Sequence, residues 1–208
     1  MQDYEVIILA AGESSRLFPI TKHFPKCLLP IGKKTLLEHQ IGFLKNHGFQ
    51  SFSLVSGHKH NTILPIAARE KIKVIHNKDY KNTNSLYSLW LTSGKYNRDI
   101  IILNSDLYFD QKLVSLILKN EDKNFAIIDA SAKWDEESTK VKVRNNAIVK
   151  WSRSFTKKEF SGENVGLVKI LKKNVPLFYK TVDALIRNNN HKKWWPEALN
   201  QFARKDIL

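Results

Sequence analysis

The chain has 208 residues, of which 42% are hydrophobic and 11% aromatic, so it can form one α/β domain with a sizeable core and is not expected to be disordered. Its 34 basic and 20 acidic residues give a formal charge of +14, which favours anionic partners such as nucleotides, nucleic acid or an acidic membrane face. The single cysteine excludes an intrachain disulfide and a cysteine-based zinc site. Because the sequence has no signal-peptide pattern and no apolar run of about 18 residues, we expect a cytoplasmic protein without a membrane span.

The first predicted element is a buried parallel strand over residues 6–9, which ends in the small residues 10–12. Small side chains there allow main-chain N–H groups to approach an anion closely. Arg16 and Lys26 add positive charge within the same proline-containing loop. This combination suits the phosphates of a nucleoside triphosphate.

The next segments alternate between helices and strands. Thr35 and Glu38 form a capping-box pattern, so a helix should begin there and end at Gly48. A strand over 52–55 ends at Gly57 in a polar turn, and a helix over 61–70 and a short strand over 74–75 follow. The alternation predicts a doubly wound sheet, in which ligands bind beyond the carboxyl ends of the strands.

A helix capped by Asn84 and Ser85 should run to about Gly94, and a fully apolar strand over 100–103 should follow it. This strand leads directly into Asp106. Hydrophobic packing gives no reason for a carboxylate at the end of a buried strand. Mg²⁺ prefers oxygen ligands and is often held by one or two carboxylates plus substrate phosphates. Asp106 is therefore the predicted metal ligand, and the alternative is a turn or N-cap aspartate.

The second half of the sequence is less regular. We expect a strand over 125–128, a hairpin of strands 141–143 and 147–149 across Asn145 and Asn146, a strand over 163–169, and helices over 175–187 and 195–204.

Residues 9–12, 16–19, Thr21, 25–26 and 28–31 together resemble the signature of the nucleotidyltransferases that activate sugar 1-phosphates and small phosphorylated alcohols or phosphonates. The chain departs from this signature at Ser14, where many members have a second glycine. The resemblance implies an α/β fold with a Rossmann-like, doubly wound mixed sheet, helices on both faces and a small β insertion. It also implies a single domain over 1–208, with a nucleotide-binding part (1–130) and an acceptor-binding part (131–208).

The resemblance also implies roles for individual residues. Arg16 and Lys26 would be catalytic, Asp106 would hold Mg²⁺, and Asn84 and Ser85 would face the base besides capping a helix. The implied nucleotide-binding set is Leu9, Ala10, Ala11, Gly12, Glu13, Gly57, Asn84 and Ser85, and the implied acceptor-binding set is Tyr87, Tyr108, Trp134 and Glu163.

The family normally continues with a C-terminal segment that contributes a further metal-binding carboxylate, and the sequence ends at Leu208 before it. Either Asp135 or Glu163 replaces that carboxylate, or the chemistry is impaired. Both possibilities remain open from the sequence.

Three functional classes follow from the sequence. We favour a cytidylyltransferase that transfers CMP from CTP to a small phosphorylated or phosphonate acceptor, with a sugar 1-phosphate enzyme as the alternative. A noncatalytic nucleotide-binding domain is the second class, and a nucleic-acid binder is a third that no recognition motif supports. Because aromatic residues accompany the expected acceptor segments, we expect an acceptor with a cationic amine. A homodimer is a further possibility.

Overall fold

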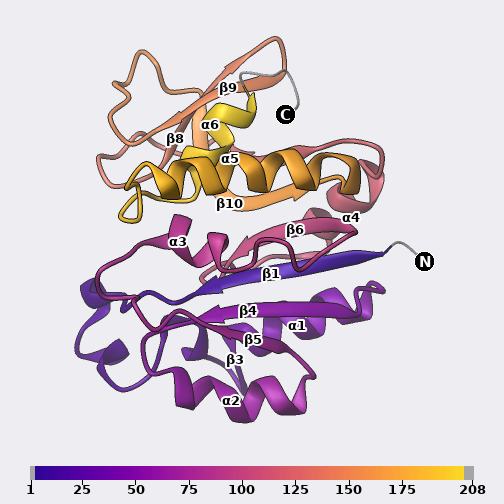
Figure 1. Cartoon of the computed structure of the whole chain (residues 1–208), viewed down its shortest axis with the longest axis vertical. Helices are drawn as coiled ribbons and strands as arrows, with labels where there is room; N and C mark the ends of the chain where they lie inside the picture. Colours follow the sequence, from indigo (N-terminus) through magenta and orange to yellow (C-terminus); the bar gives the residue numbers. More distant parts are fainter. Residues whose placement is uncertain (1–2, 204–208) are drawn as a thin grey trace.

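The computed structural model describes residues 3–203 of the chain, and its main feature is a mixed sheet of 8 strands. Seven of the strands follow one another in the order β5-β4-β1-β6-β10-β8-β9 (Figure 1). Strand β7 pairs with β10 beside that path. The strands are β1 (Tyr4–Ala10), β4 (Ser51–Ser56), β5 (Lys73–His76), β6 (Asp99–Asn104), β7 (Phe125–Asp129), β8 (Lys140–Arg144), β9 (Ala147–Ser152) and β10 (Gly162–Ile170). A separate two-stranded sheet joins β2 (Pro30–Ile31) to β3 (Lys34–Thr35).

The sheet has a parallel half and an antiparallel half. Strands β5, β4, β1 and β6 are parallel, with Leu9 opposite Val55 on one side and Asn104 on the other. Strand β10 is antiparallel to β6, β7 and β8, and β8 is antiparallel to β9. The carboxyl ends of β1 and β6 therefore lie side by side at one edge of the sheet.

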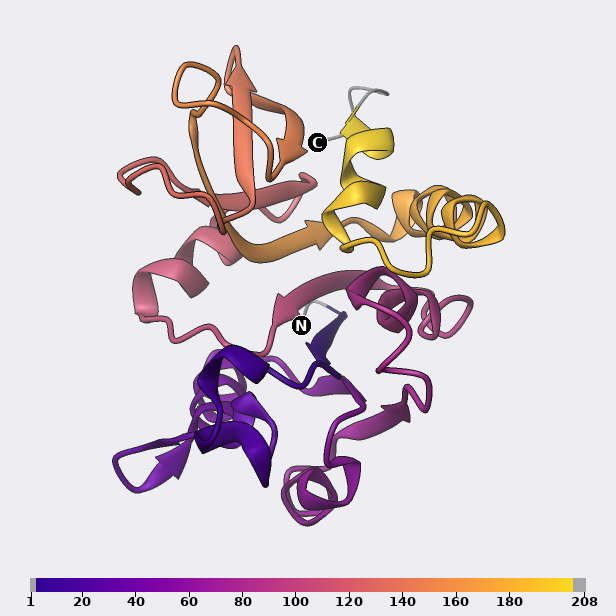
Figure 2. The same ribbon diagram turned by 90° about the vertical axis from the view of Figure 1, so that its left-hand side faces the viewer.

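Helices cover both faces of the sheet, as viewed along the strands in Figure 2. Residues alternate along the central strands because successive side chains of a strand point to opposite faces. Ile100 and Ile102 of β6 pack into one core with α3, α5 and α6, whereas Ile101 and Leu103 pack into the other with α1, α2 and α4. The helices are α1 (Leu36–Asn46), α2 (His60–Arg69), α3 (Ser85–Trp90), α4 (Gln111–Lys119), α5 (Val175–Arg187) and α6 (Pro196–Ala203). The predicted doubly wound α/β fold is thus confirmed.

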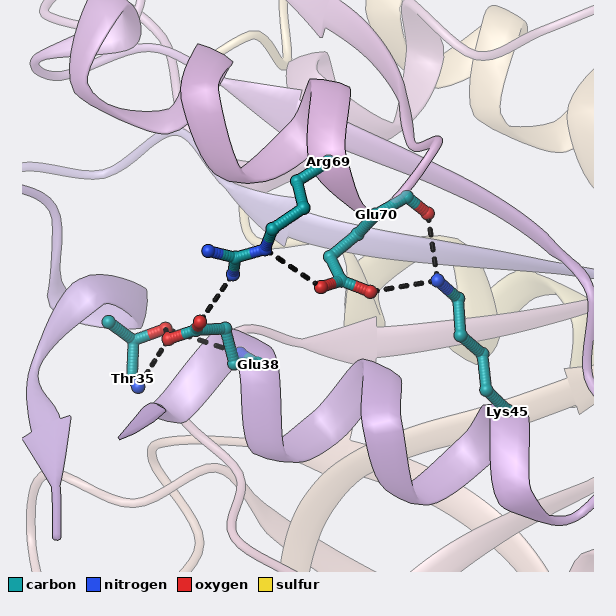
Figure 3. A network of polar contacts seen from close by, with 5 residues as sticks. All are labelled: Thr35, Glu38, Lys45, Arg69 and Glu70. Atoms are coloured by element: carbon teal, nitrogen blue, oxygen red, sulfur yellow. Dashed lines mark hydrogen bonds and ion pairs between the residues drawn. The ribbon is translucent and has the colours of Figure 1, made fainter. Parts of the chain in front are cut away.

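The predicted capping box begins α1. The Glu38 backbone N–H donates to Thr35 Oγ1 at 3.3 Å, and the Thr35 N–H donates to Glu38 Oε2 at 2.7 Å. Figure 3 shows that this box continues into a polar network with the end of α2, in which Glu38 pairs with Arg69 and Lys45 Nζ lies 2.8 Å from Glu70 Oε2. Hydrogen bonds from Thr35 lower the pKa of Glu38, and the contact with Lys45 lowers that of Glu70. The network fixes α1 and α2 against each other.

The predicted hairpin over the second half is also present. Asn145 and Asn146 connect β8 to β9 with φ values of 50° and 60°, the left-handed conformation that a tight two-residue hairpin turn requires and that Asn tolerates. This hairpin extends the sheet beyond β10 and forms the small β insertion.

Some boundaries differ from those predicted. Helix α3 ends at Trp90, and turns occupy the rest of the segment predicted to be helical as far as Gly94. Helix α6 is described to Ala203, and Arg204, the last residue of the predicted helix, lies outside the described residues. Helix α4 was not predicted, although Asp110 caps it by accepting from the Lys112 N–H at 2.9 Å. Within the described residues, no helix has the length and apolar character to cross a membrane.

Candidate active site

A cleft of about 1110 Å³ opens where the carboxyl ends of β1 and β6 meet the β7–β10 half of the sheet. One wall comes from the nucleotide loop, by which we mean residues 9–17 together with Lys26. The opposite wall comes from the acceptor end, by which we mean residues 129, 135, 137–139 and 163–165. The start of α3, the end of β6 and residues 194–196 complete the lining.

The nucleotide loop leaves β1 and turns at Ser14, whose φ of 52° and ψ of 43° are left-handed. The turn is fixed from inside because Thr21 Oγ1 and the Leu17 N–H each donate to the Ser14 carbonyl at 2.9 Å. Thr21 is fully buried, which explains why the motif requires a small hydroxyl residue there. Residues Leu9 to Glu13 of the predicted nucleotide-binding set all line the cleft.

Gly57 supports this loop without lining the cleft. A Cβ at this position would lie 2.5 Å from the Ala11 carbonyl oxygen and 2.7 Å from Tyr80 Cβ, so only glycine fits. The following residue, His58, donates its backbone N–H to the same Ala11 carbonyl at 2.9 Å. Gly57 therefore acts by allowing close packing of the turn after β4 against the nucleotide loop.

Each of the predicted catalytic cations pairs with a carboxylate that lines the cleft. Lys26 Nζ lies 3.0 Å from Asp106 Oδ2, and Arg16 pairs with Glu137 of the opposite wall. All four side chains are partly or largely exposed. Surface ion pairs of this kind contribute roughly 0–1 kcal/mol, so phosphate groups can replace these carboxylates at little cost.

Asn84 and Ser85 line the cleft at the start of α3, and they also hold the chain segment before α6. The Asn84 N–H donates to the His191 carbonyl at 2.8 Å, and Ser85 Oγ accepts from the Trp195 N–H at 3.0 Å. Asn84 Oδ1 accepts from the Ser85 N–H at 2.7 Å. These residues thus perform the capping role, and their position in the cleft is compatible with the base-binding role that the resemblance implies.

Asn104, which was not predicted as a site residue, lies between Trp195 and the β10 backbone at Gly166. Its Oδ1 accepts from the Trp195 indole N–H at 3.1 Å, and because that N–H can only donate, the amide nitrogen faces the other way. Gly166, with a φ of +86°, accommodates this nitrogen, since a Cβ there would lie 2.2 Å from Asn104 Nδ2. The β10 glycine therefore leaves room for the end of β6.

The acceptor end is rich in carboxylates, which include Asp129, Asp135 and Glu163. Burial raises the pKa of Glu163, and the nearby charges of Asp135 and Asp129 raise it further, against an opposing effect of Lys140. This local excess of negative charge contrasts with the net charge of +14 for the whole chain. A cationic ligand group would relieve the repulsion between these carboxylates.

Three predicted acceptor residues lie outside the cleft lining. The Tyr87 ring makes tilted contacts with the rings of Trp90 and His191. Trp134 Nε1 donates to the Phe155 carbonyl at 2.8 Å, and Tyr108 lines a separate cavity of about 180 Å³. Of the predicted set, Glu163 alone lines the cleft. The exposure of a ring is decided by tertiary packing, which a local sequence pattern does not record.

The aromatic residues that do line the cleft are Tyr80, Trp194 and Trp195. Trp195 is 1% exposed, whereas Trp194 is 44% exposed and carries the Arg153 guanidinium 4.9 Å from its ring centroid. The pair of adjacent tryptophans is visible in the sequence and could have indicated that the segment before α6 contributes to the cleft.

Asp106 fits a magnesium site only in part. Its carboxylate has 41% side-chain exposure at the end of β6 and faces the nucleotide loop through its contact with Lys26. No group of three or more His, Cys, Asp or Glu residues that could hold a metal ion occurs among residues 3–203. The donor set therefore suits Mg²⁺ that takes most of its ligands from substrate phosphates and water.

Comparisons with known proteins identify the family. The sequence profile of the family described as nucleotidyl transferase matches residues 5–141, more than half of the chain. The chain belongs to this family. The nucleotidyltransferase class expected from the sequence is thus confirmed, together with the predicted fold.

The relatives include enzymes with different acceptors. The chain is 32% identical over 98 residues to a choline-phosphate cytidylyltransferase of Streptococcus pneumoniae, a match that spans 47% of this chain and only 43% of that protein. It is 24% identical over 204 residues to a CTP:phosphoglutamine cytidylyltransferase of Campylobacter jejuni, with 88% of this chain and 81% of that protein covered. A UDP-glucose pyrophosphorylase structure complexed with UDP-glucose shares the fold, with a TM-score of 0.75 at 15% identity over 99% of this chain and 88% of that one.

Proposed function

We propose that the protein transfers CMP from CTP to a small phosphorylated or phosphonate acceptor that carries a cationic amine, and releases pyrophosphate. The observation that carries this proposal is the division of the cleft. A loop with Arg16 and Lys26 lies on one wall and an acidic acceptor end on the other, so the two substrates can meet between them.

The choice of CTP is supported by the two relatives whose names specify cytidylyl transfer. The choice of a cationic acceptor is supported by Asp129, Asp135 and Glu163, which give this end of the cleft a negative charge that would repel an unshielded anion. The acceptor's phosphate or phosphonate would then lie toward Lys26, and its amine toward the carboxylates.

In the proposed reaction, an acceptor oxygen attacks the α-phosphorus of CTP in line with the leaving group. A new P–O bond forms as the bond between the α-phosphorus and the bridging oxygen breaks, and pyrophosphate leaves with that electron pair. No covalent intermediate with the protein is needed, so catalysis rests on positioning and charge neutralisation. Lys26 neutralises the α-phosphate, Arg16 holds the departing β and γ phosphates, and the nucleotide loop orients them through its backbone N–H groups.

Asp106 is the residue that would hold Mg²⁺, and the ion would supply further neutralisation of the triphosphate charge. The Lys26–Asp106 contact brings the two residues to the same point of the cleft. Both can therefore act on the same phosphate group.

Transfer to a sugar 1-phosphate is the second candidate. The similarity in fold to UDP-glucose pyrophosphorylase favours it, although the two sequences are only 15% identical. A sugar requires hydrogen-bonding partners for neutral hydroxyl groups rather than a cluster of negative charges, so the acidic acceptor end favours the amine.

Pyrophosphate release by the full chain with Mg²⁺ and each of the four NTPs tests the proposal, with aminoethylphosphonate, phosphocholine and glucose 1-phosphate offered separately. We expect release with CTP and an amine-bearing acceptor. Release with none of the twelve combinations would instead support a noncatalytic nucleotide-binding domain, provided that CTP binding is detected by calorimetry.

A further inference from the structure

Two buried polar atoms at the acceptor end lack a hydrogen-bond partner within the described residues. They are Ser138 Oγ and Asn164 Oδ1. Ser138 is 9% exposed, and both residues line the cleft. Buried polar atoms are almost always hydrogen-bonded in folded proteins, so a pair left unpartnered in a ligand cleft indicates contacts that a ligand completes.

The backbone places Asn164 on β10 and Ser138 in the bend just before β8. The Asn164 N–H donates to the Thr139 carbonyl at 2.8 Å, where β10 pairs with the start of β8. The Ser138 N–H donates to Asp135 Oδ1 at 2.9 Å, and the Ser138 carbonyl accepts from Lys140 Nζ at 3.2 Å. Both residues are therefore held in place before any ligand binds. The Ser138 and Glu137 N–H groups lower the pKa of Asp135, and the nearby Ser138 hydroxyl lowers it further, so this hydroxyl is oriented toward Asp135 and keeps its lone pairs for a ligand. The Asn164 side-chain oxygen has no partner within the described residues.

The side chains around these atoms are mostly acceptors, and the nearby ammonium of Lys140 donates to the main-chain carbonyls of Glu136, Ser138 and Arg153. Asp135 and Glu163 are carboxylates, and the Glu163 side chain has no hydrogen-bond or ion-pair partner among residues 3–203. An amide oxygen is likewise an acceptor, and the Ser138 hydroxyl can accept through its lone pairs. A ligand group that satisfies this end of the cleft must therefore bring several donors and a positive charge.

An aromatic cage, the usual means of holding a quaternary ammonium group, is not assembled here. Among the described residues, Tyr87, Tyr108 and Trp134 lie outside the cleft lining, and the exposed Trp194 ring already has the Arg153 guanidinium against it. Of the other two aromatic residues that line the cleft, Tyr80 packs against the His58 ring beside the nucleotide loop, and Trp195 is only 1% exposed. A trimethylammonium group has no N–H and would leave the Ser138 and Asn164 oxygens buried without partners.

We propose that Ser138, Asn164 and Glu163 form a subsite for the primary ammonium group of the acceptor, and that the enzyme discriminates against its quaternary counterpart. Three N–H donors of –NH₃⁺ match the serine hydroxyl, the amide oxygen and the carboxylate, while Asp135 adds charge. This inference rests on the proposed function, because it assumes that an amine-bearing acceptor occupies the cleft.

The test is the full chain with CTP and Mg²⁺ and either phosphoethanolamine or phosphocholine, which differ only by three N-methyl groups. We expect kcat/KM to be at least about tenfold higher with phosphoethanolamine, since a site that binds N–H groups rejects an analogue without them. Ser138→Ala and Asn164→Leu should each remove most of that preference by raising the KM for phosphoethanolamine, with the KM for CTP unchanged.

Ser93→Ala is the matched control, because Ser93 Oγ is also buried without a partner among the described residues but lies outside the cleft lining. It should leave the preference intact. Equal or better turnover with phosphocholine, or an unchanged preference in both subsite variants, would overturn the subsite while the proposed function stands. Turnover with glucose 1-phosphate alone would overturn the proposed function and the subsite with it.

Discussion

The nucleotide loop and the acceptor end differ in how they are assembled. The loop is a nearly continuous stretch whose shape is set by its own contacts, such as those of Thr21 and Leu17 with the Ser14 carbonyl. The acceptor end is built from residues next to β7, β8 and β10 that are distant in the sequence, as in the hydrogen bond from the Asn164 N–H to the Thr139 carbonyl. A local assembly constrains the sequence at fixed spacings, whereas a distributed one allows the acceptor preference to change by substitutions scattered along the chain.

The largest expected effect is on the nucleotide side. Asp106→Ala should abolish Mg²⁺-dependent turnover with every acceptor, because it removes the carboxylate that would hold the ion. Asp106→Asn, which keeps the shape, should be nearly as inactive. Rates measured against Mg²⁺ concentration check this, and an unchanged dependence in either variant would place the metal elsewhere.

Lys26→Ala should reduce kcat on the order of a hundredfold, the scale for losing one preorganised charge-stabilising group. The loss should be the same for all acceptors, since Lys26 acts on the α-phosphate. Lys22→Ala is the control because Lys22 is an exposed lysine of the same loop that does not line the cleft. Thermal melting should show both variants folded, and a much lower melting temperature for Lys26→Ala alone would assign it a structural role.

Gly166→Ala should mainly affect the acceptor side. The new Cβ would displace the Asn104 amide, and its φ of +86° adds backbone strain of about 1–3 kcal/mol. Gly94→Ala is a matched control because Gly94 has a φ of +72° with no atom within 4 Å of the added Cβ. Both variants should lose stability in denaturant titrations, but only Gly166→Ala should raise the KM for the acceptor. Equal KM values would show that Asn104 does not shape the acceptor pocket.

Glu163→Gln should have the smallest effect, a several-fold increase in the KM for an amine acceptor with little change for CTP. Burial and the charges of Asp135 and Asp129 raise the Glu163 pKa, so in the wild type amine binding should weaken as the pH falls through that raised pKa and the carboxylate becomes neutral. The variant should lack this pH dependence, whereas Glu136→Gln should retain it, because Glu136 is an exposed residue between β7 and β8 that does not line the cleft. A wild-type acceptor KM that is flat over mildly acidic pH would contradict the assignment.

The sequence predicted much of the fold because its strongest patterns are local. The apolar strands of the parallel half, the Thr35–Glu38 capping box and the Asn145–Asn146 turn each depend on neighbouring residues. The same holds for the residues from Leu9 to Lys26 that line the nucleotide wall.

Apart from Glu163, the sequence did not predict which residues of the acceptor side line the cleft. Trp194, Asn104 and Asn164 reach the cleft through pairings between distant segments, and Tyr108 and Trp134 face elsewhere for the same reason. Helix α4 was missed although Asp110 precedes an apolar repeat at helical spacing. The roles proposed for individual site residues remain predictions.

The most direct test of the central claim is a competition in which aminoethylphosphonate, phosphocholine and glucose 1-phosphate are supplied together with CTP, and the products are identified by mass spectrometry. The arrangement of the cleft predicts CMP linked to an amine-bearing acceptor, with the primary amine preferred. Product formed exclusively from glucose 1-phosphate would contradict the assignment of the acidic acceptor end to a cationic substrate.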